Sequence, residues 1–338
     1  MIFLSQIQYI SIFTLHSLTL FLIVLLIVAY FTLAERKIIA SIQSRQGPDY
    51  IGFFGLLQPI ADGIKLLTKE YIIPSQSNLL YFVAAPIIVF VCSFIQWFQI
   101  PLNSQDYTVL GIIDLSLLFL SAFGSLGSIG IFIAGWASNS KYALLGALRS
   151  IAQVISYEIA LSTVFLCIAS YTSTLKIYWI VYNQSMICYL VLPLLPVFML
   201  FYIITVAETN RSPFDLPEGE SEIVAGFNVE YSGIAFALFF LGEYAKIIAV
   251  SAINVLVFFG GWDYHQILFF IPKKESSMNL FFHTISLGLK ILLMSCLFIL
   301  IRAVLPRYRV DQLMRLGWKM FLPLLLAIFI VISLAHFF

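Results

Sequence analysis

Charge is scarce in this sequence. Of its 338 residues, 10% are Asp, Glu, Lys or Arg and 61% are hydrophobic, and the mean hydropathy is +1.00. An ordinary soluble domain carries about 25% charged residues, so the composition excludes that class. No basic patch lies outside the expected interhelical loops, so nothing supports nucleic-acid binding and we expect no nucleic-acid partner. The composition instead predicts an all-α integral membrane protein.

Cysteine and histidine are also scarce. The four cysteines each stand alone in an apolar run, and the four histidines are scattered, so neither set has the spacing of a metal, cluster or redox site. They are Cys92, Cys167, Cys188, Cys296, His16, His265, His283 and His336. A dinucleotide-binding loop is missing too, because Gly124, Gly127 and Gly130 have the wrong spacing and lie in a hydrophobic run. We expect no metal site, and these glycines favour close helix packing.

Long apolar runs, by contrast, are abundant. The first 34 residues contain no Lys or Arg, so the charged start of a cleavable signal peptide is absent and we expect the first run to be retained. A membrane-spanning helix needs about 20 apolar residues, and eight stretches qualify. They are residues 11–34, 79–100, 110–136, 150–171, 185–207, 223–258, 283–305 and 319–337. The sequence thus predicts one membrane domain of eight transmembrane helices over residues 1–338.

The distribution of Lys and Arg predicts the orientation of these spans. Thirteen basic residues follow odd-numbered spans, whereas only Lys176, Lys273 and Lys274 follow even-numbered ones. Positive charge accumulates on the cytoplasmic or matrix side of a membrane protein. We therefore expect the odd-numbered loops on that inner side and both termini on the opposite side.

The first inner loop, residues 35–78, contains an amphipathic pattern. Between residues 55 and 71, four apolar residues share one helical stripe, namely Leu56, Ile60, Ile64 and Leu67. Asp62, Lys65 and Lys69 lie elsewhere around the helix. This pattern predicts a helix lying along the membrane interface, although periodicity alone leaves a plain surface helix equally open.

Acidic residues are concentrated in one break between apolar runs. Seven of the 17 acidic residues lie there, at Glu208, Asp215, Glu218, Glu220, Glu222, Glu230 and Glu243. A carboxylate in or beside a membrane costs several kcal/mol unless it is paired, hydrated or protonated. The cluster therefore predicts proton handling or a polar cavity. Salt bridges between helices are the alternative, with Lys141, Arg211 and Arg302 as available partners.

Helical periodicity adds an expected arrangement of these acids. A continuous helix over residues 223–258 would be about 54 Å long and would place Glu222, Glu230 and Glu243 toward one side. Lys246, three residues after Glu243, is the expected neutralising group. In the fourth span, Glu158 lies nine residues from Arg149 and points to the opposite side, so it needs a partner on another helix, internal water or a proton.

Five strings of the sequence resemble a known family. They are AERK at 34–37, LQPIADGIK at 57–65, GWASNSKY at 135–142, ETNRSPFDLPEGESE at 208–222 and DQLM at 311–314. These strings are similar to those of the subunit 1 family of respiratory NADH:ubiquinone oxidoreductase, complex I. The resemblance runs in order from about residue 30 to residue 325.

This resemblance implies an eight-helix subunit that joins the hydrophilic redox arm to the proton-pumping membrane arm. It implies a quinone tunnel with ubiquinone as substrate and no cofactor bound by this chain. NADH, FMN and iron-sulfur clusters would belong to partner subunits, and the neighbours would be quinone-site subunits of the hydrophilic arm, small membrane-arm subunits and the lipid bilayer. The expected location is the mitochondrial inner membrane, with odd-numbered loops facing the matrix and both termini facing the intermembrane space.

The resemblance also implies roles for individual residues. Those that would line or flank the quinone tunnel are Glu35, Arg36, Asp62, Phe214, Phe227, Arg302 and Arg307. Those that would form an acidic proton path toward the membrane arm are Glu158, Glu208, Glu218, Glu220, Glu222, Glu230 and Glu243. Because closely spaced acids titrate as a set, reduction of the quinone would change their proton occupancy together.

Two other interpretations remain open at the level of the sequence. A plastoquinone-reducing homologue or a membrane-bound hydrogenase would share this architecture, but the short chain and its 32 Phe residues favour a mitochondrially encoded product. An independent secondary transporter would use the acids for ion movement. Transporters commonly show matching halves, and no internal repeat relates the first four spans to the last four.

Overall fold

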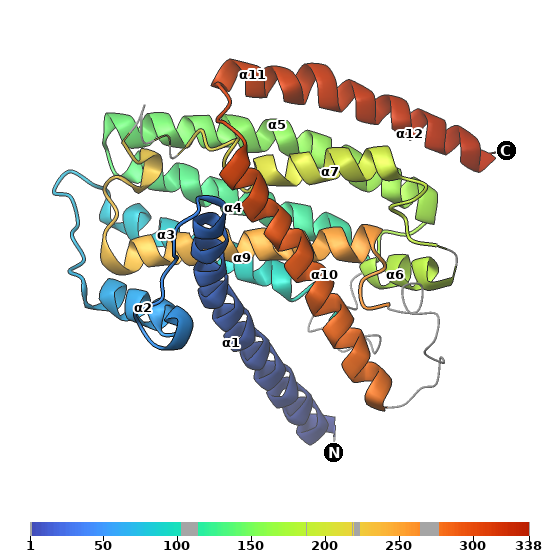
Figure 1. Cartoon of the computed structure of the whole chain (residues 1–338), viewed down its shortest axis with the longest axis horizontal. Helices are drawn as coiled ribbons and strands as arrows, with labels where there is room; N and C mark the ends of the chain where they lie inside the picture. The colour runs from blue at the N-terminus through green and yellow to red at the C-terminus, as the bar shows by residue number, and fades with distance from the viewer. Residues whose placement is uncertain are drawn as a thin grey trace.

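The computed structural model describes residues 2–102, 114–186, 188–217, 219, 224–263 and 277–337. These residues form helices joined by turns and loops, and contain no β-strand (Figure 1). The α-helices are α1 (Ile2–Ile42), α2 (Gln58–Thr68), α3 (Leu79–Trp97), α4 (Ser116–Ala137), α5 (Lys141–Thr172), α6 (Ile177–Met186), α7 (Leu195–Glu208), α9 (Gly233–Phe258), α10 (Ser277–Val304), α11 (Val310–Arg315) and α12 (Leu322–Phe337). Short 3-10 helices η1 (Phe53–Gly55) and η2 (Gly226–Asn228) and the π-helix η3 (Leu316–Phe321) complete the set.

Seven of the helical segments in the described residues are long and apolar enough to cross a membrane. They are Thr14–Ile42, Leu79–Trp97, Ser116–Ala137, Lys141–Thr172, Gly233–Phe258, Phe282–Val304 and Val310–Ala335. These segments agree with the expected all-α integral membrane protein. The expected count of eight is not reached, because the fifth expected span contains only the 14-residue helix α7.

Prolines explain why the expected span 185–207 is not one helix. Helix α6 ends at Met186 and α7 begins at Leu195, with turns between them that include Pro193. Proline has no backbone N–H and fits most readily in the first turn of a helix, although α3 also contains Pro86 in its interior. Pro196 occupies the first turn of α7. The expected span therefore contains the end of α6, turns and the short helix α7.

The expected continuous helix over residues 223–258 is also wrong. Helix α9 begins at Gly233, and the preceding residues form η2 and turns. Gly226 and Gly233 have φ angles of 57° and 56°, which lie outside the helical region and favour glycine. A Cβ on Gly233 would lie 2.9 Å from the carbonyl oxygen of Lys69, so the inner loop packs directly against this break.

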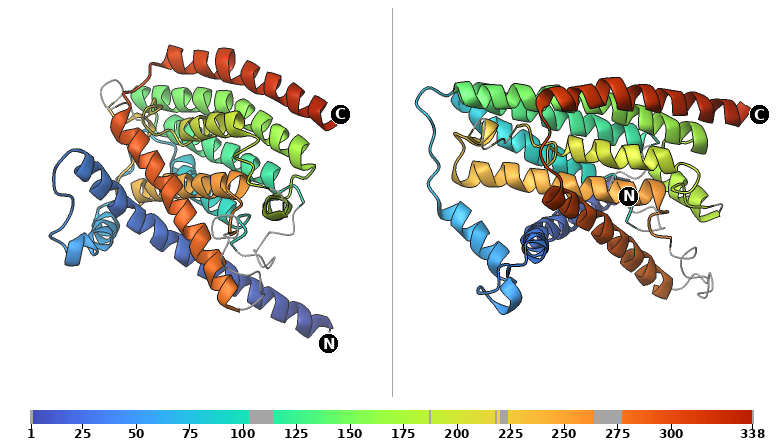
Figure 2. Two further views of the ribbon diagram at one scale, coloured as in Figure 1. Left: turned by 45° about the vertical axis from the view of Figure 1, so that its right-hand side comes forward. Right: turned by 45° about the horizontal axis from the view of Figure 1, so that its top comes forward.

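The helices form a layered bundle crossed by two slanting helices. Helices α3, α4, α5, α7, α9 and α12 run broadly side by side, while α1 and α10 lie obliquely across α9 (Figures 1 and 2). Helix α1 has 41 residues and is about 61 Å long at 1.5 Å per residue, which is longer than a bilayer is thick. Such a helix must tilt or protrude. The C-terminal parts of α1 and α10 meet beside α9, where Glu35 pairs with Arg302.

Close packing of small residues holds the bundle together. In a membrane, helix association depends on van der Waals packing rather than on the hydrophobic effect. A Cβ on Gly130 of α4 would lie 2.7 Å from Val89 of α3, and one on Gly146 of α5 would lie 2.7 Å from the Cα of Gly226. This close approach confirms the interpretation of Gly130 as a packing residue.

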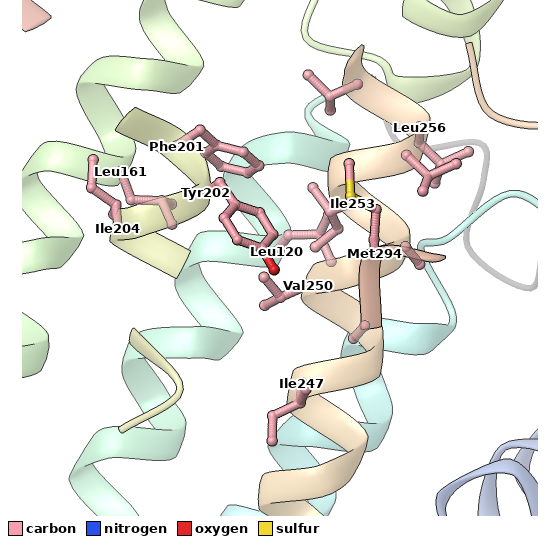
Figure 3. Packing of buried hydrophobic residues seen from close by; sticks show 14 of the residues in the cluster. Leu120, Leu161, Phe201, Tyr202, Ile204, Ile247, Val250, Ile253, Leu256 and Met294 are labelled. Carbon is pink, nitrogen blue, oxygen red and sulfur yellow. The ribbon is translucent and has the colours of Figure 1, made fainter. Parts of the chain in front are cut away.

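Large apolar side chains fill the interior between these contacts. Residues from α4, α5, α7, α9 and α10 meet in the cluster drawn in Figure 3. Phe201 is 1% exposed, and Leu120, Val250 and Met294 surround the same region. This apolar interior packs along the middle of α7, and the acidic segment begins at the C-terminal end of the same helix.

Candidate functional site: a chain of buried charges

The first link of the site is Glu35. Helix α1 continues to Ile42, so Glu35 lies inside the helix. It is therefore not a charged residue at the end of a membrane helix that extends its side chain toward the membrane surface. The residue is 6% exposed. Its carboxylate forms an ion pair with Arg302 of α10 and accepts a hydrogen bond from the hydroxyl of Tyr244 of α9. One buried carboxylate thus joins three helices.

The second link is Arg211, which lies in the acidic segment and is 8% exposed. Its guanidinium carbon is 4.4 Å from the centre of the Tyr244 ring. A desolvated contact of this kind is worth about 2 kcal/mol. On its other side, Nη2 of Arg211 lies 3.9 Å from Oε2 of Glu243. Arg211 therefore connects the Glu35 group to the first acid of α9.

The third link is Lys246, one turn after Glu243. Its ammonium group is 3.1 Å from Oε1 of Glu208 and donates to the backbone oxygen of Glu208 at 3.3 Å. Glu208 ends α7, and a cation is favourable at a helix C-terminus. Partial neutralisation of Glu243 by Lys246 stays a prediction, while the ion pairs of the structure join Glu243 to Arg211 and Lys246 to Glu208.

The last link is Glu158 in the middle of α5. The side chains that act on its carboxyl are Ser125, Glu208 and Lys246, from α4, α7 and α9. The prediction that Glu158 finds its partners on other helices is therefore confirmed. The described residues thus contain two groups of interacting side chains. The first runs through Arg302, Glu35, Tyr244, Arg211 and Glu243, and the second contains Lys246, Glu208 and Glu158. The two groups meet at a cavity that Glu243, Lys246 and Glu208 border, and together they are called the acidic series.

Small cavities accompany this series. A cavity of about 40 Å³ borders Glu208, Glu243 and Lys246, and a second of about 20 Å³ borders Glu208 from the side of the apolar interior. A third of about 10 Å³ lies beside Glu35, Arg211 and Arg302. One water needs about 10 to 15 Å³ of such space. The charges are therefore arranged around room for a few waters and not around a wide channel.

A second ion pair lies next to Glu35 in the sequence but faces outward. Nη1 of Arg36 is 2.8 Å from Oδ2 of Asp62, and the two side chains are 49% and 36% exposed. This pair joins α1 to α2, and Gln58 donates a hydrogen bond to Asp62 at 3.0 Å. The expected helix of the inner loop is present as α2. Its apolar stripe is exposed, with Ile64 at 57%, and its position along the interface stays a prediction.

Phe214 and Arg307 lie together at a third place. Phe214 is 4% exposed and stacks on Tyr308 with 5.4 Å between ring centres. Arg307 donates to the backbone oxygen of Leu216 at 3.4 Å, and a Cβ on Gly219 would lie 2.7 Å from its guanidinium carbon. The basic segment after α10 therefore covers the first part of the acidic segment.

Gln153 of α5 fixes the acidic segment from inside. Its amide nitrogen donates to the backbone oxygens of Ala207 at 2.7 Å and Phe214 at 2.9 Å. Gln153 is fully buried. These two bonds replace helical partners that the segment lacks once α7 has ended. They also set where Arg211 can lie.

Two more of the expected site residues, Phe227 and Glu230, lie apart from this series. Phe227 is 2% exposed and packs with Phe239 in a separate apolar cluster. Glu230 lies in the turn before α9, so it does not share a helical face with Glu243. Glu218, Glu220 and Glu222 lie outside the described residues. The expected quinone residues thus occupy several separate places.

Sequence reasoning gave Tyr244 no role, and it considered Arg211 only as a salt-bridge partner. The available signals were the neighbouring positions of Glu243 and Tyr244 in an apolar helix, and the single cation within the acidic segment. Neither signal identifies the residue that Tyr244 or Arg211 contacts.

In the part of the chain that the structure describes, no group of three or more His, Cys, Asp or Glu residues could hold a metal ion.

The chain is similar to known proteins along nearly all of its length. A family model described as NADH dehydrogenase matches residues 15–333. The chain is 48% identical over 316 residues to NADH-ubiquinone oxidoreductase chain 1 of Chondrus crispus, covering 94% of each, and 49% identical over 317 residues to that of Triticum aestivum, again covering 94% of each. It is 50% identical over 315 residues to an NADH-quinone oxidoreductase subunit of Rickettsia typhi, covering 93% of this chain and 90% of the relative.

Proposed function

The chain belongs to the NADH dehydrogenase family, and on this premise we propose that it is a membrane subunit of proton-pumping NADH:ubiquinone oxidoreductase. In this proposal it forms part of the quinone tunnel and an acidic path that couples quinone reduction to proton translocation. The observation that carries the proposal is the acidic series, in which the group from Arg302 to Glu243 and the group from Lys246 to Glu158 meet at one cavity.

The quinone end of the proposed path is the Glu35 and Arg302 pair. The cavity beside it has apolar walls, including Phe31 and Phe298, and two buried charges, as a site for a hydrophobic molecule with a polar headgroup requires. Its volume of about 10 Å³ is too small for a quinone ring. We therefore assign the rest of the tunnel wall to partner subunits.

The other expected tunnel residues are proposed to flank that wall. The pair Arg36 and Asp62 lies on the exposed side of the same helix as Glu35. Phe214 and Arg307 lie where the basic and acidic segments pack together. Phe227 supports the turn before α9 through its contact with Phe239.

The acidic path is proposed to respond to the charge of the quinone. Reduction to quinol takes up two electrons and two protons, so the nearby carboxylates gain or lose protons in response. Because Glu35 and Glu243 are joined through Tyr244 and Arg211, a change at one alters the electrostatic energy of the other. Glu158 and Glu208 lie at the far end of the path. Glu218, Glu220, Glu222 and Glu230 are proposed to extend it.

The proposal also assigns cofactors, partners and location. This chain binds no redox cofactor of its own, while NADH, FMN and the iron-sulfur clusters belong to other subunits. Its partners are the quinone-site subunits of the hydrophilic arm, small subunits of the membrane arm and the lipid bilayer. The chain forms one multi-pass domain in the mitochondrial inner membrane, with its odd-numbered loops in the matrix and its termini in the intermembrane space.

Kinetics with a short-chain ubiquinone test the tunnel assignment. Arg302→Ala in the assembled enzyme should raise the apparent KM for quinone or lower turnover about tenfold, more than it lowers the amount of assembled enzyme. Arg315→Ala is the matched control, because Arg315 is exposed in the next inner segment. Unchanged affinity and turnover in Arg302→Ala would overturn the assignment.

Two further measurements test the rest of the proposal. Native-gel separation should find the chain only in a very large assembly that oxidises NADH. Mass identification of the co-purifying subunits should distinguish this enzyme from a plastoquinone-reducing or hydrogenase complex.

The acidic path is tested by a substitution. Glu220→Gln should impair proton pumping by reconstituted vesicles. Normal assembly, quinone reduction and pumping in that variant would count against the acidic path.

A further inference from the structure

Gln96, near the C-terminal end of α3, occupies the boundary between two cavities. It borders both the cavity of about 40 Å³ and the cavity of about 20 Å³, and it shares that position only with Glu208. Its side chain comes from a helix that contributes no charged residue to the acidic series. The junction between the cavities is therefore formed by one acid and one neutral amide.

The amide of Gln96 is buried and only partly satisfied. The residue is 4% exposed, and its nitrogen donates to the backbone oxygen of Leu120 at 3.3 Å. Its oxygen Oε1 is fully buried and has no hydrogen-bond partner among the described residues. A buried polar atom without a partner is costly, and such atoms are commonly satisfied by an ordered water. Gln96 borders two cavities that each have room for one.

Gly124 of α4 leaves the space in which the two side chains approach. A Cβ at this position would lie 3.0 Å from Oε1 of Glu208 and 3.4 Å from Nε2 of Gln96. Because Gly124 has no side chain, the carboxylate and the amide can both lie close to its Cα. Gly124 also borders the larger cavity, together with both residues.

The two cavities differ in their chemistry. The larger one is bordered by Glu243, Lys246 and the Asn210 amide, whose oxygen is also buried without a partner. The smaller one lies among apolar side chains of α4, α5, α7 and α9, and its polar groups besides Gln96 and Glu208 are Ser121 and Thr205. The smaller cavity is about large enough for one water, with two to four polar partners. Leu120, Leu161, Phe201, Val250 and Ile253, which Figure 3 labels, are among the side chains that line it.

We propose that Gln96 is a positioning residue of the acidic path, and that its amide holds water between the two cavities against the carboxylate of Glu208. A water in the smaller cavity, which Lys246 does not border, gives Glu208 a hydrogen-bond partner besides Lys246. The other charged groups that face Glu208 are Lys246 and Glu158, with Glu243 across the larger cavity. Gln96 thereby sets the hydrogen bonding of Glu208 without carrying a proton itself. This inference rests on the proposed function of Glu208.

Redox-induced infrared difference spectroscopy of the assembled enzyme tests the inference. Glu208→Gln identifies the carboxyl band of Glu208 as the one that disappears. Gln96→Met, which is near in shape but cannot hydrogen-bond, should shift this band, and it should slow coupled quinone reduction about tenfold, the effect of one lost hydrogen bond. Gln96→Glu keeps two polar atoms at the same place and should retain more activity than Gln96→Met.

Gln99→Met is the matched control. Gln99 lies just after the end of α3, is 1% exposed and has both amide atoms buried without partners, yet it borders none of the three cavities. A merely structural role for a buried amide predicts equal effects of the two Met substitutions. An unchanged Glu208 band in Gln96→Met, or the same shift in Gln99→Met, would overturn the inference.

A second variant decides the case in which Gln96→Met does not assemble. Gly124→Ala places a methyl group against both Glu208 and Gln96 without altering either side chain, and it should shift the same band. An unchanged band there would overturn the inference.

Proton pumping distinguishes failure of this inference from failure of the proposed function. If the enzyme with Glu208→Gln pumps normally, the proposed path and this inference fail together. If Glu208→Gln is defective while Gln96→Met is normal, the inference fails alone.

Discussion

Glu35 and Arg302 form an ion pair although 267 positions separate them in the chain, and the Glu35 side chain is buried whereas that of Arg302 is 33% exposed. The pair joins the C-terminal parts of α1 and α10, and Tyr244 of α9 completes it with a hydrogen bond to Glu35. A buried carboxylate is costly to desolvate, and it becomes more costly when its partner is removed. Its energetics can therefore be separated from its role in quinone chemistry.

A double-mutant cycle on this pair is the first prediction. Arg302→Met alone should destabilise the subunit by about 3 to 5 kcal/mol, because it leaves the Glu35 carboxylate buried without its counter-charge. Glu35→Gln in the same chain should restore much of that loss. Thermal inactivation of the assembled enzyme measures both effects. A loss in the double variant equal to the sum of the losses in Arg302→Met alone and Glu35→Gln alone would show that the pair makes no net interaction.

Tyr244 offers a way to separate its hydroxyl from its ring. Tyr244→Phe removes the donor to Glu35 but keeps the ring beneath Arg211, whereas Tyr244→Leu removes both. Coupled quinone reduction should fall in Tyr244→Phe and fall about tenfold further in Tyr244→Leu, since a desolvated cation–π contact is worth up to about 2 kcal/mol. Rates with a short-chain ubiquinone provide the measurement. Identical rates in the two variants would contradict the contact with Arg211.

Glycine substitutions should have opposite effects at two positions. Gly146→Ala places a Cβ 2.7 Å from the Cα of Gly226, so it should push η2 away from α5 and cost about 1 to 3 kcal/mol. Gly63→Ala is the matched control, because a Cβ there meets nothing within 4 Å and α2 should gain about 1 kcal/mol from the better helix former. The half-time of thermal inactivation should shorten in the first variant and not in the second.

Lys290 is expected to hold the far end of α9. Its ammonium group donates to the backbone oxygens of Phe259 at 2.8 Å, Gly261 at 3.0 Å and Asp263 at 2.6 Å, beyond the end of the helix. Lys290→Met should lower the stability of the assembled enzyme by at least about 3 kcal/mol, because each bond to a charged donor contributes about 1.5 to 3 kcal/mol. The yield of assembled enzyme should fall as a result, and thermal inactivation measures the loss of stability. Lys319→Met, at an exposed position, should have no such effect.

Tyr231 gives an expected pH dependence. It lies outside the spanning segments, is 5% exposed, stacks on Phe82 and donates to the backbone oxygen of Phe82 at 3.3 Å. Burial, and secondarily the charge of Tyr71, raise the pKa of Tyr231 above its ordinary value of 10.0. The unfolded chain therefore loses this proton first, so the stability contributed by Tyr231 is present below about pH 10 and declines above it.

The corresponding experiment compares thermal midpoints at increasing pH. The wild-type enzyme should lose stability more steeply above about pH 10 than Tyr231→Phe, which has no proton to lose. Both should behave alike at neutral pH apart from the lost hydrogen bond. Parallel profiles across the alkaline range would show that Tyr231 does not contribute to the pH dependence.

Local features of the sequence predict several helices but not all of their boundaries. The runs around Leu79 and Ser116 give helices near the expected places, since long apolar runs require satisfied backbone groups in a membrane. Hydropathy treated residues 223–258 as one such run. Gly233 interrupts it through its positive φ and its contact with the Lys69 backbone, which is a contact between distant segments. Pro193 and Pro196 could have indicated the interruption before α7 from the sequence itself.

The sequence predicted which residues belong to the candidate site better than it predicted which of them form ion pairs. Periodicity required that Glu158 find partners on other helices, and this was confirmed. It also suggested Lys246 as the partner of Glu243, because only neighbours on the same helix can be deduced from spacing. The tertiary structure gives Lys246 to Glu208 and Arg211 to Glu243.

The sequence by itself determined that this chain is an apolar helical protein with a concentrated group of acids that need compensation, because composition and hydropathy are properties of the residues alone. Only the tertiary structure decided how the acids are compensated. The crossing of α1 and α10 over α9 sets the neighbours of Glu35, and the end of α7 sets those of Glu208. Electrostatic energy depends on distances of a few ångströms between helices, and such distances are fixed by packing rather than by sequence spacing.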